Sequence, residues 1–168
     1  MTPNSDEAAL VALSSLPGVG PNRLRAMLLS AGSDGPLVAW RLVVDRHLQR
    51  LRPLLECVGV GPAQVAQWSA ALRRLDAEAL LAVHGDSGVQ LTSGSQLSTV
   101  EPWSSDPEPP AVLFRLGRTV RAVPAVAIVG TRRCTGYGRR VAATIAADLA
   151  KAGVTVVSGV AQGIDGAA

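Results

Sequence analysis

The chain has 168 residues, of which 48% are hydrophobic, enough for one ordinary domain or two small domains with real cores. Its 16 basic and 13 acidic residues give a net charge of +3, too small by itself to indicate a polyanion partner. Two distant cysteines without a CxxC or histidine-rich motif argue against a disulfide framework and against a zinc site. The acidic N-terminus, and the lack of an apolar run near the roughly 18 residues of a membrane span, favour a cytoplasmic protein without a membrane partner.

Residues 1–84 are predicted to form a helical domain. Helix starts are indicated at Asn4 or Ser5, Pro21, Gly35 and Gly61, and helix stops at Pro17 and Gly32. The helix that starts at Gly61 extends to about Val83, with a break near Asp76. In the helices that start at Gly35 and Gly61, a tryptophan, Trp40 or Trp68, stands among aliphatic residues. We therefore expect both indoles to lie in a hydrophobic core rather than to stack on a ligand.

Residues 85–124 are predicted to be a connector with short strands. The stretch "GVQLTS" is typical of a short strand, "VEPWSSDPEPP" of a loop, and "AVLFRLG" of an edge strand with alternating apolar residues. The composition of this stretch, rich in Gly, Ser, Thr and Pro, separates it from the helical domain before it.

Residues 125–168 contain two short apolar runs, "AVAIVG" and "VTVVSG", on either side of a helix expected from about Tyr137 to Ala152. Strand, helix and strand in this order form a βαβ unit, whose two strands lie parallel in one sheet. The first run is too continuously apolar for a strand that faces solvent on one side, so it is expected to be buried on both faces. The predicted fold class is therefore α/β, with a helical N-terminal domain.

A glycine-rich loop, "GTRRCTGYGRR", follows the first of these strands. Gly130 permits a sharp exit from the strand, and Gly136 and Gly138 allow a ligand to approach the backbone where the helix begins. The free N–H groups and the positive dipole at a helix start favour an anion, and Arg132 and Arg133 add charge in the loop. Phosphate is the anion that this loop predicts.

A second glycine-rich loop, "SGVAQGID", follows the second strand. Gly159 and Gly163 allow another tight turn, Ser158 offers a hydroxyl group, and Asp165 is expected either to cap the next helix or to hold an arginine. Because ligands bind outside the carboxyl ends of parallel strands, both loops are expected on the same side of the sheet.

The spacing of these glycines excludes two common nucleotide-binding motifs. The first loop is neither the GxGxxG of dinucleotide-binding domains nor the GxxxxGK[ST] of nucleotide triphosphatases. Cys134 has no histidine within residues 125–168 to activate it, so no catalytic nucleophile is predicted. A protein that binds without catalysis, and without a cofactor or metal, is the expectation.

The N-terminal domain carries another candidate phosphate site, in "LPGVGPNRLRAML". A tight turn between two helices brings the backbone at Gly18 and Gly20 close enough to meet a DNA phosphate, with Arg23 beside it. The alternative is that this turn serves only to pack two helices.

These residues together resemble the DNA-processing protein A (DprA, also called Smf) family of bacterial transformation. "LPGVGPNRLRAML" looks like the start of its helical, SAM-like or helix-hairpin-helix domain, and "PPAVLFRLG" looks like its entry to the sheet. "VAIVGTRRCTGYGRR" and "AGVTVVSGVAQGIDGAA" resemble its two most recognisable blocks. The resemblance implies a Rossmann-like domain that binds single-stranded DNA, forms homodimers, helps load the RecA recombinase, and is not an enzyme.

The resemblance also suggests roles for single residues. Gly130, Thr131 and Arg132 match the family's Gly-Ser-Arg phosphate loop, and Gln162 stands where the family often has a basic residue. The residues that match the family's second loop are Ser158, Gly159, Gly163, Ile164 and Asp165. Tyr137 follows the family pattern, which suggests a buried ring, with base stacking as the alternative. The residues expected to contact nucleic acid are Gly18, Gly20, Arg23, Gly130, Thr131, Arg132, Arg133, Gly136, Gly138, Ser158, Gly159, Gln162 and Gly163.

The chain departs from the family where it ends, because the family continues past "GIDGAA" into the rest of its sheet. The expectation is therefore an incomplete Rossmann-like domain over residues 125–168, and a fragment of a longer protein. Two alternatives remain open at this point: a nucleotide-processing enzyme of the lysine-decarboxylase-like (LOG) group, which has a similar sheet and similar loops, and a truncated remnant without function.

Overall fold

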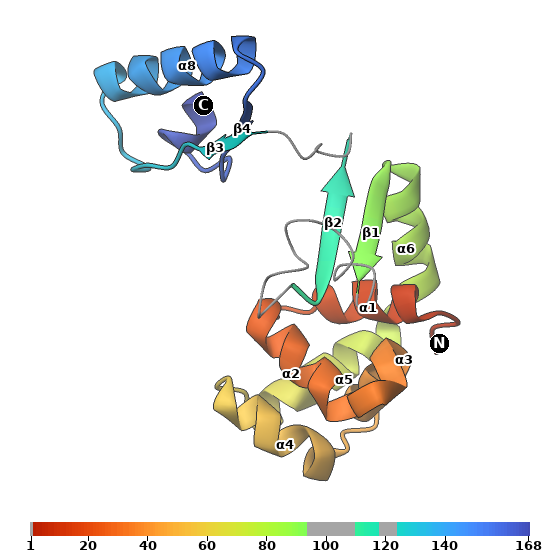
Figure 1. The fold of residues 1–168 in the computed structure, drawn as a ribbon. Helices are drawn as coiled ribbons and strands as arrows, with labels where there is room; N and C mark the ends of the chain where they lie inside the picture. Colours follow the sequence, from red (N-terminus) through yellow and green to blue (C-terminus); the bar gives the residue numbers. More distant parts are fainter. Residues whose placement is uncertain (1, 94–109, 118–123) are drawn as a thin grey trace. The chain divides into compact units, whose positions relative to one another are not determined.

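The computed structural model describes residues 2–93, 110–117 and 124–168. It divides the chain into two compact units, Met1–Arg118 and Thr119–Ala168, which are described here one at a time. Within the described residues, six α-helices come first, followed by short strands that include one parallel pair (Figure 1). This confirms the mixed α/β class. The loop predicted from "VEPWSSDPEPP" lies outside the described residues except for Pro110.

The first unit begins with helices whose ends follow local rules. They are α1 (Asp6–Ser14), α2 (Pro21–Ala31), α3 (Gly35–Val44), α4 (Leu48–Cys57), α5 (Pro62–Arg74) and α6 (Ala77–Asp86), with a short 3-10 turn, Gly32–Asp34, between α2 and α3. The Ser5 hydroxyl accepts a hydrogen bond from the Ala8 amide at 3.1 Å, and the Asp76 carboxylate accepts one from the Ala79 amide at 3.0 Å. The predicted starts near Ser5 and Pro21, and the predicted break near Asp76, are confirmed.

Helix α4 was not predicted from the sequence. It contains Pro53, which lacks the N–H group needed for a hydrogen bond within the helix and is usually excluded from helix interiors. The helix nevertheless forms because Leu51 and Leu55 are fully buried in the core of the unit. Tertiary packing therefore outweighs the local preference against a helix at this position.

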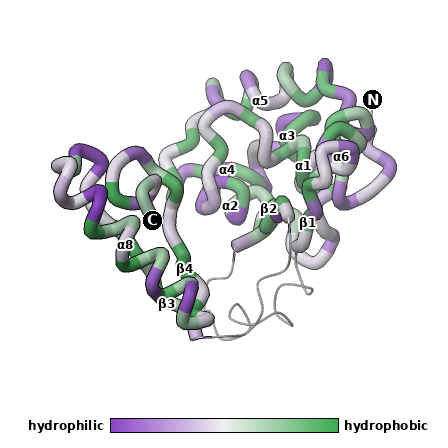
Figure 2. The backbone as a smooth tube through the Cα atoms, turned by 90° about the horizontal axis from the view of Figure 1, so that it is seen from above, coloured by the Kyte–Doolittle hydropathy of each residue, from purple (hydrophilic) through white to green (hydrophobic). Residues whose placement is uncertain are grey.

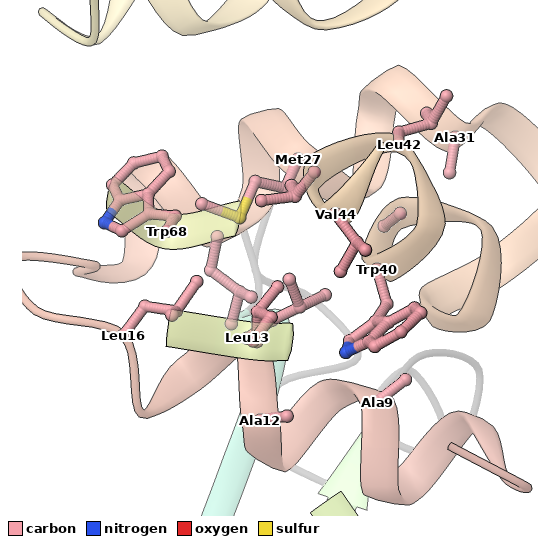
Figure 3. Packing of buried hydrophobic residues seen from close by; sticks show 14 of the residues in the cluster. Ala9, Ala12, Leu13, Leu16, Met27, Ala31, Trp40, Leu42, Val44 and Trp68 are labelled. Atoms are coloured by element: carbon pink, nitrogen blue, oxygen red, sulfur yellow. The ribbon is translucent and has the colours of Figure 1, made fainter. Parts of the chain in front are cut away.

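The core of the first unit is built from all six helices. Figure 3 shows Trp68, Met27, Leu13 and Trp40 among the side chains that fill it, and each of these four is at most 6% exposed. The Trp68 indole N–H also donates a hydrogen bond to the Pro17 carbonyl oxygen at 3.1 Å, so its polar atom is satisfied. The predicted core role of Trp40 and Trp68 is confirmed.

A buried polar contact joins the end of α3 to α5. The Ser69 hydroxyl donates to the Val44 carbonyl oxygen at 2.6 Å, and the Arg73 guanidinium donates to the same oxygen at 2.7 Å. The last carbonyl groups of a helix have no partner within the helix, so these two donors satisfy one of them. The charge of Arg73 is also favourable at this negative end of the α3 dipole.

Two antiparallel strands complete the described part of the first unit. β1 (Val89–Ser93) pairs with β2 (Val112–Leu116), with Leu91 opposite Phe114. β1 lies against α6, and the Phe114 ring lies 5.6 Å from the His84 ring. The strands predicted from "GVQLTS" and "AVLFRLG" are therefore confirmed.

The second unit contains β3 (Ala125–Ala127), α8 (Gly136–Lys151), β4 (Thr155–Val157) and a short 3-10 turn, η3 (Asp165–Ala167). β3 and β4 pair in parallel, with Val126 opposite Val156, and two further bonds, from Ile128 N–H to Val157 and from Thr155 N–H to Pro124, extend the ladder. Strand, helix and strand thus follow the predicted order.

Burial in the second unit differs from the expectation. All three residues of β3 are exposed, so the prediction that this strand is covered on both faces is wrong for the described chain. Among the described residues, β3 pairs with one strand, β4. The buried residues of α8 are Ala142 and Ala146 alone. Figure 2 shows hydrophilic and hydrophobic residues alternating along α8. No helix in the described ranges is both long and apolar enough to cross a membrane.

Substitution of Pro53 by alanine tests how α4 is held together. Alanine restores a backbone donor and removes the clash of the proline ring, so we expect the free energy of unfolding to rise by about 2 kcal/mol. Urea denaturation followed by tryptophan fluorescence measures the change. Arg50→Ala, at another exposed position of α4, is the control and should change the value by less than about 0.5 kcal/mol. A destabilised Pro53→Ala variant would contradict this account of the helix.

Candidate nucleic-acid interface

The two glycine-rich loops of the second unit pack directly on each other. A Cβ atom at Gly130 would lie 2.6 Å from Cβ of Ile164, and one at Gly138 would lie 3.4 Å from Cδ1 of the same side chain. Ile164 of the second loop therefore occupies the space left open by two glycines of the first. At Gly130 a side chain is excluded outright, because real Cβ contacts are never this short.

Gly163 is restricted in two ways. Its φ of +105° lies in a region that residues with side chains avoid, and a Cβ atom there would overlap the Thr131 carbonyl oxygen and lie 2.7 Å from Cα of Arg132. The Ile164 amide donates to the same Thr131 oxygen at 3.2 Å. The second loop thus supports the backbone that carries Arg132.

Asp165 links the two loops by a charged hydrogen bond. Its carboxylate accepts from the Gly130 amide at 3.0 Å across 35 positions of sequence. A Cβ atom at Gly159 would lie 2.9 Å from this carboxylate, so Gly159 makes room for it. Of the two roles expected for Asp165, neither an arginine partner nor a side-chain helix cap is present among the described contacts; its partner is the first loop.

Hydroxyl groups hold the rest of the two loops. The Ser158 hydroxyl lies 2.8 Å from the Ile128 carbonyl oxygen and 3.2 Å from the Asp165 carbonyl oxygen, so it donates within the protein. The Thr131 hydroxyl accepts from the Arg133 amide at 3.2 Å. Both predicted site residues therefore shape the loops through hydrogen bonds to the backbone.

The start of α8 leaves backbone donors open. The Thr135 hydroxyl caps the helix by accepting from the Gly138 amide at 3.1 Å, and the Arg139 amide donates to the Thr135 carbonyl oxygen. The Gly136 and Tyr137 amides have no hydrogen-bond partner within the part of the chain that the structure describes. These two N–H groups stand at the positive end of a 16-residue helix, where an anion is favoured.

Four arginines lie within a few residues of these donors in the sequence. Arg132 and Arg133 in the loop, and Arg139 and Arg140 in the first turns of α8, are all exposed. None of the four has an ion pair or a side-chain hydrogen bond among residues 124–168. By contrast, Lys151 at the other end of α8 pairs with Asp148 at 3.3 Å.

The charge of the chain is divided unevenly between its two units. Thr119–Ala168 holds six basic residues and two acidic ones, whereas Met1–Arg118 holds ten basic and eleven acidic residues. The net charge of +3 therefore comes entirely from the second unit.

Two further residues of the second unit are open to solvent. Gln162 is exposed in the second loop. Tyr137 is 72% exposed, so the expectation of a buried ring is wrong in the described chain. The ring projects from the first turn of α8, whose inward face is taken by Ala142 and Ala146. No described side chain covers Tyr137 as a core residue would be covered.

Val160, between β4 and η3, has a φ of 54° although its side chain is branched at Cβ. This left-handed conformation is rare for such residues and costs on the order of 1–3 kcal/mol. The side chain is 85% exposed, so no packing offsets that cost. The second loop is therefore held in shape by its contacts with the first rather than by its own preference.

The turn between α1 and α2 carries the other three predicted residues, Gly18, Gly20 and Arg23, in the first unit. Gly18 has a φ of +73°, and the Arg23 guanidinium donates to its carbonyl oxygen at 2.8 Å and to that of Val58 at 3.4 Å. Arg23 thus ties the turn to the end of α4. Gly20 has open space around it, and all three residues line a groove of about 550 Å³ together with Cys57 and Val58.

The ten predicted residues of the second unit therefore come together in two interlocked loops, and the three of the first unit come together at one turn. Ile164, Asp165 and Thr135, which hold the loops, were not among the residues predicted to form the site. Asp165 was expected in the second loop, but with other partners, and Thr135 could have been found as a polar residue beside a helix start. Within the described ranges, no three His, Cys, Asp or Glu side chains gather as a metal site would require.

Comparison with known proteins identifies relatives for both units. The family model of DNA recombination-mediator protein A matches residues 95–168. Protein Smf of Synechocystis sp. is 30% identical over 169 residues, an alignment that covers 96% of this chain and 40% of that protein.

Shorter alignments reach higher identity. A protein of Mycobacterium tuberculosis that is named as a DNA processing protein DprA is 56% identical over 62 residues, or 35% of this chain and 16% of that protein. The DNA processing protein DprA of Bacillus subtilis is 41% identical over 61 residues, or 35% of this chain and 20% of that protein. The chain thus spans at most 40% of the length of these relatives.

Gly163→Ala tests the contact between the loops. Both the positive φ and the overlap with the Thr131 carbonyl oppose a methyl group, so we expect the loops to lose about 2–4 kcal/mol of stability. Hydrogen exchange of the Gly130 amide, followed by NMR, would become at least tenfold faster. Gly136→Ala is the control, because a Cβ atom there meets only the flexible end of Arg140 at 3.7 Å. Equal effects of the two variants would contradict the interlocked arrangement.

Val160→Gly tests the strain in the second loop. Glycine adopts a positive φ without cost, so we expect a gain of about 1 kcal/mol, seen as roughly fivefold slower exchange of the Ile164 amide. The matched control is Ala161→Gly. Ala161 does not have a positive φ, so glycine there should lower the stability of the loop by about 0.5–1 kcal/mol. If both glycines destabilised the loop alike, Val160 would not be strained in solution.

Proposed function

The chain belongs to the DprA/Smf family of DNA-processing proteins, and from this premise we propose that it binds single-stranded DNA through the two interlocked loops of its second unit. The observation that carries the proposal is a group of four exposed arginines, none with a partner among the described residues, in the loop before α8 and in its first turns, where two backbone amides are open. They are Arg132, Arg133, Arg139 and Arg140. Guanidinium groups and helix N-termini are both favourable ligands for phosphate.

We propose that the first loop contacts the ligand and that the second loop positions the first. The first loop and the start of α8 contact the phosphates, with Arg132, Arg133 and the Gly136 amide as the direct ligands. The second loop positions them, since Gly163 and Asp165 support the backbone of the first. Gln162 supplies an exposed, uncharged contact from the second loop. Binding of this kind depends on salt and little on base sequence.

The turn at Gly18 and Gly20 is proposed as a second, weaker phosphate contact made by backbone amides. Arg23 would act there through its hydrogen bond to the Gly18 carbonyl, which keeps the turn in shape. The near-neutral charge of the first unit supports only a minor share of DNA binding for this turn.

The chain covers 40% of Protein Smf of Synechocystis, so the wider roles are proposed for a protein of that full length. The family description as a recombination mediator supports the proposal that the whole protein helps load the RecA recombinase on single-stranded DNA during natural transformation, in the cytoplasm, as a homodimer and without catalysis. On the same grounds we propose a SAM-like or helix-hairpin-helix domain over residues 1–84, a connector over residues 85–124, and the first part of a Rossmann-like domain over residues 125–168.

The double variant Arg132→Ala/Arg133→Ala tests the proposed site. Each lost phosphate contact should lower the slope of log affinity against log salt by about 0.7 for a single strand, so the pair should lower it by about 1.4 and weaken binding at low salt. Fluorescence anisotropy with a short labelled oligo(dT) measures both. Lys151→Ala, a cation already paired with Asp148, is the matched control and should leave the slope unchanged. Unchanged affinity of the double variant would place the DNA elsewhere.

A further inference from the structure

The second unit contains a single aromatic residue, Tyr137, which is also the only tyrosine of the chain. It is 72% exposed, an unusual state for a large ring that could otherwise lower its free energy by burial. Glycines stand on both sides of it in the sequence, at Gly136 and Gly138, so no adjacent side chain covers the ring.

The surroundings of the ring are cationic. Arg140, three residues on, and Val141, four residues on, are its neighbours on the surface of α8, and Arg133 lies in the loop just before the helix. Both arginines are exposed, and neither has a partner among the described residues. An exposed ring close in sequence to exposed arginines without partners is a combination with which proteins hold single-stranded nucleic acid, because the cations contact the backbone and the ring stacks on a base.

We propose that Tyr137 is a base-stacking residue, and that it gives this site its preference for single-stranded over double-stranded DNA. The inference rests on the proposed function and adds the part of the ligand that arginines do not recognise. Arginine contacts to phosphate serve single and double strands alike. A base in a duplex is already stacked on its neighbours, so only an unpaired base is free to cover the ring.

The bases, rather than the backbone, are thus predicted to contact Tyr137, which makes the inference separable from the phosphate site. Loss of the ring should weaken binding without changing its salt dependence, because no counterion is released by stacking. Loss of Arg132 and Arg133 should instead change the slope. Val141 is 36% exposed and Ile145 is 49% exposed along the same side of α8, so a leucine at position 137 would preserve an apolar row but not a stacking surface.

The experiment measures the affinity of the 168-residue chain for oligo(dT), for an abasic strand of equal length, and for a duplex, each at two salt concentrations. Tyr137→Leu should bind oligo(dT) about tenfold more weakly with an unchanged salt slope. Tyr137→Phe keeps the ring and should stay within about twofold of the wild type. Tyr137→Leu should bind the abasic strand with the same affinity as the wild type, and it should also match the wild type on the duplex. Val141→Ala controls for loss of an exposed apolar group on the same helix.

The outcomes separate the two proposals. Failure of the wild type to bind any of the strands would overturn the proposed function and this inference with it. Normal binding of oligo(dT) by Tyr137→Leu, or an equal loss on the abasic strand, would overturn the inference alone. If circular dichroism showed Tyr137→Leu to be unfolded, the affinities of the wild type for oligo(dT) and for the abasic strand would be compared instead. Equal affinities would exclude stacking.

Discussion

The contact between the two glycine-rich loops is the constraint on which the candidate site depends. Ile164 fills the space beside Gly130 and Gly138, Gly163 lies against the backbone of Thr131 and Arg132, and Asp165 accepts a hydrogen bond from the Gly130 amide. None of these contacts involves a ligand. They shape the backbone of the loop that carries Arg132 and Arg133, so this loop is ordered by folding and needs no ligand to order it.

Glycines that look alike in the sequence have different structural roles in the two loops. Gly130 and Gly163 are required by neighbouring atoms within the protein. A Cβ atom at Gly136 would meet only the flexible end of Arg140 at 3.7 Å, and the Gly136 amide has no partner among the described residues. A glycine-rich loop after a strand is therefore not in itself evidence that every glycine approaches a ligand. Here most of them approach the other loop, and one short stretch of backbone at the start of α8 stays open.

Much of the fold followed from the sequence because its boundaries are set by local chemistry. Ser5, Pro21 and Asp76 mark helix starts through contacts within a few residues, and such contacts are visible in a sequence. Helix α4 was missed because Pro53 opposes it locally while the burial of Leu51 and Leu55 favours it at long range. The ten residues predicted for the second unit lie in two adjoining loops, as their motifs indicated, and their role in binding stays a prediction. The bond from Gly130 to Asp165 spans 35 positions, and no local pattern predicts it. The exposure of Tyr137 likewise depends on what lies around α8 rather than on its own motif.

The uneven distribution of charge has a consequence for how a nucleic acid meets this protein. With the excess of cations confined to Thr119–Ala168 and the rest of the chain nearly neutral, the long-range field attracts a polyanion to the second unit before any contact forms. For the proposed DNA ligand, this attraction would raise the rate of encounter with the second unit, most strongly at low ionic strength. The first unit, whose net charge is near zero, adds little to this long-range attraction.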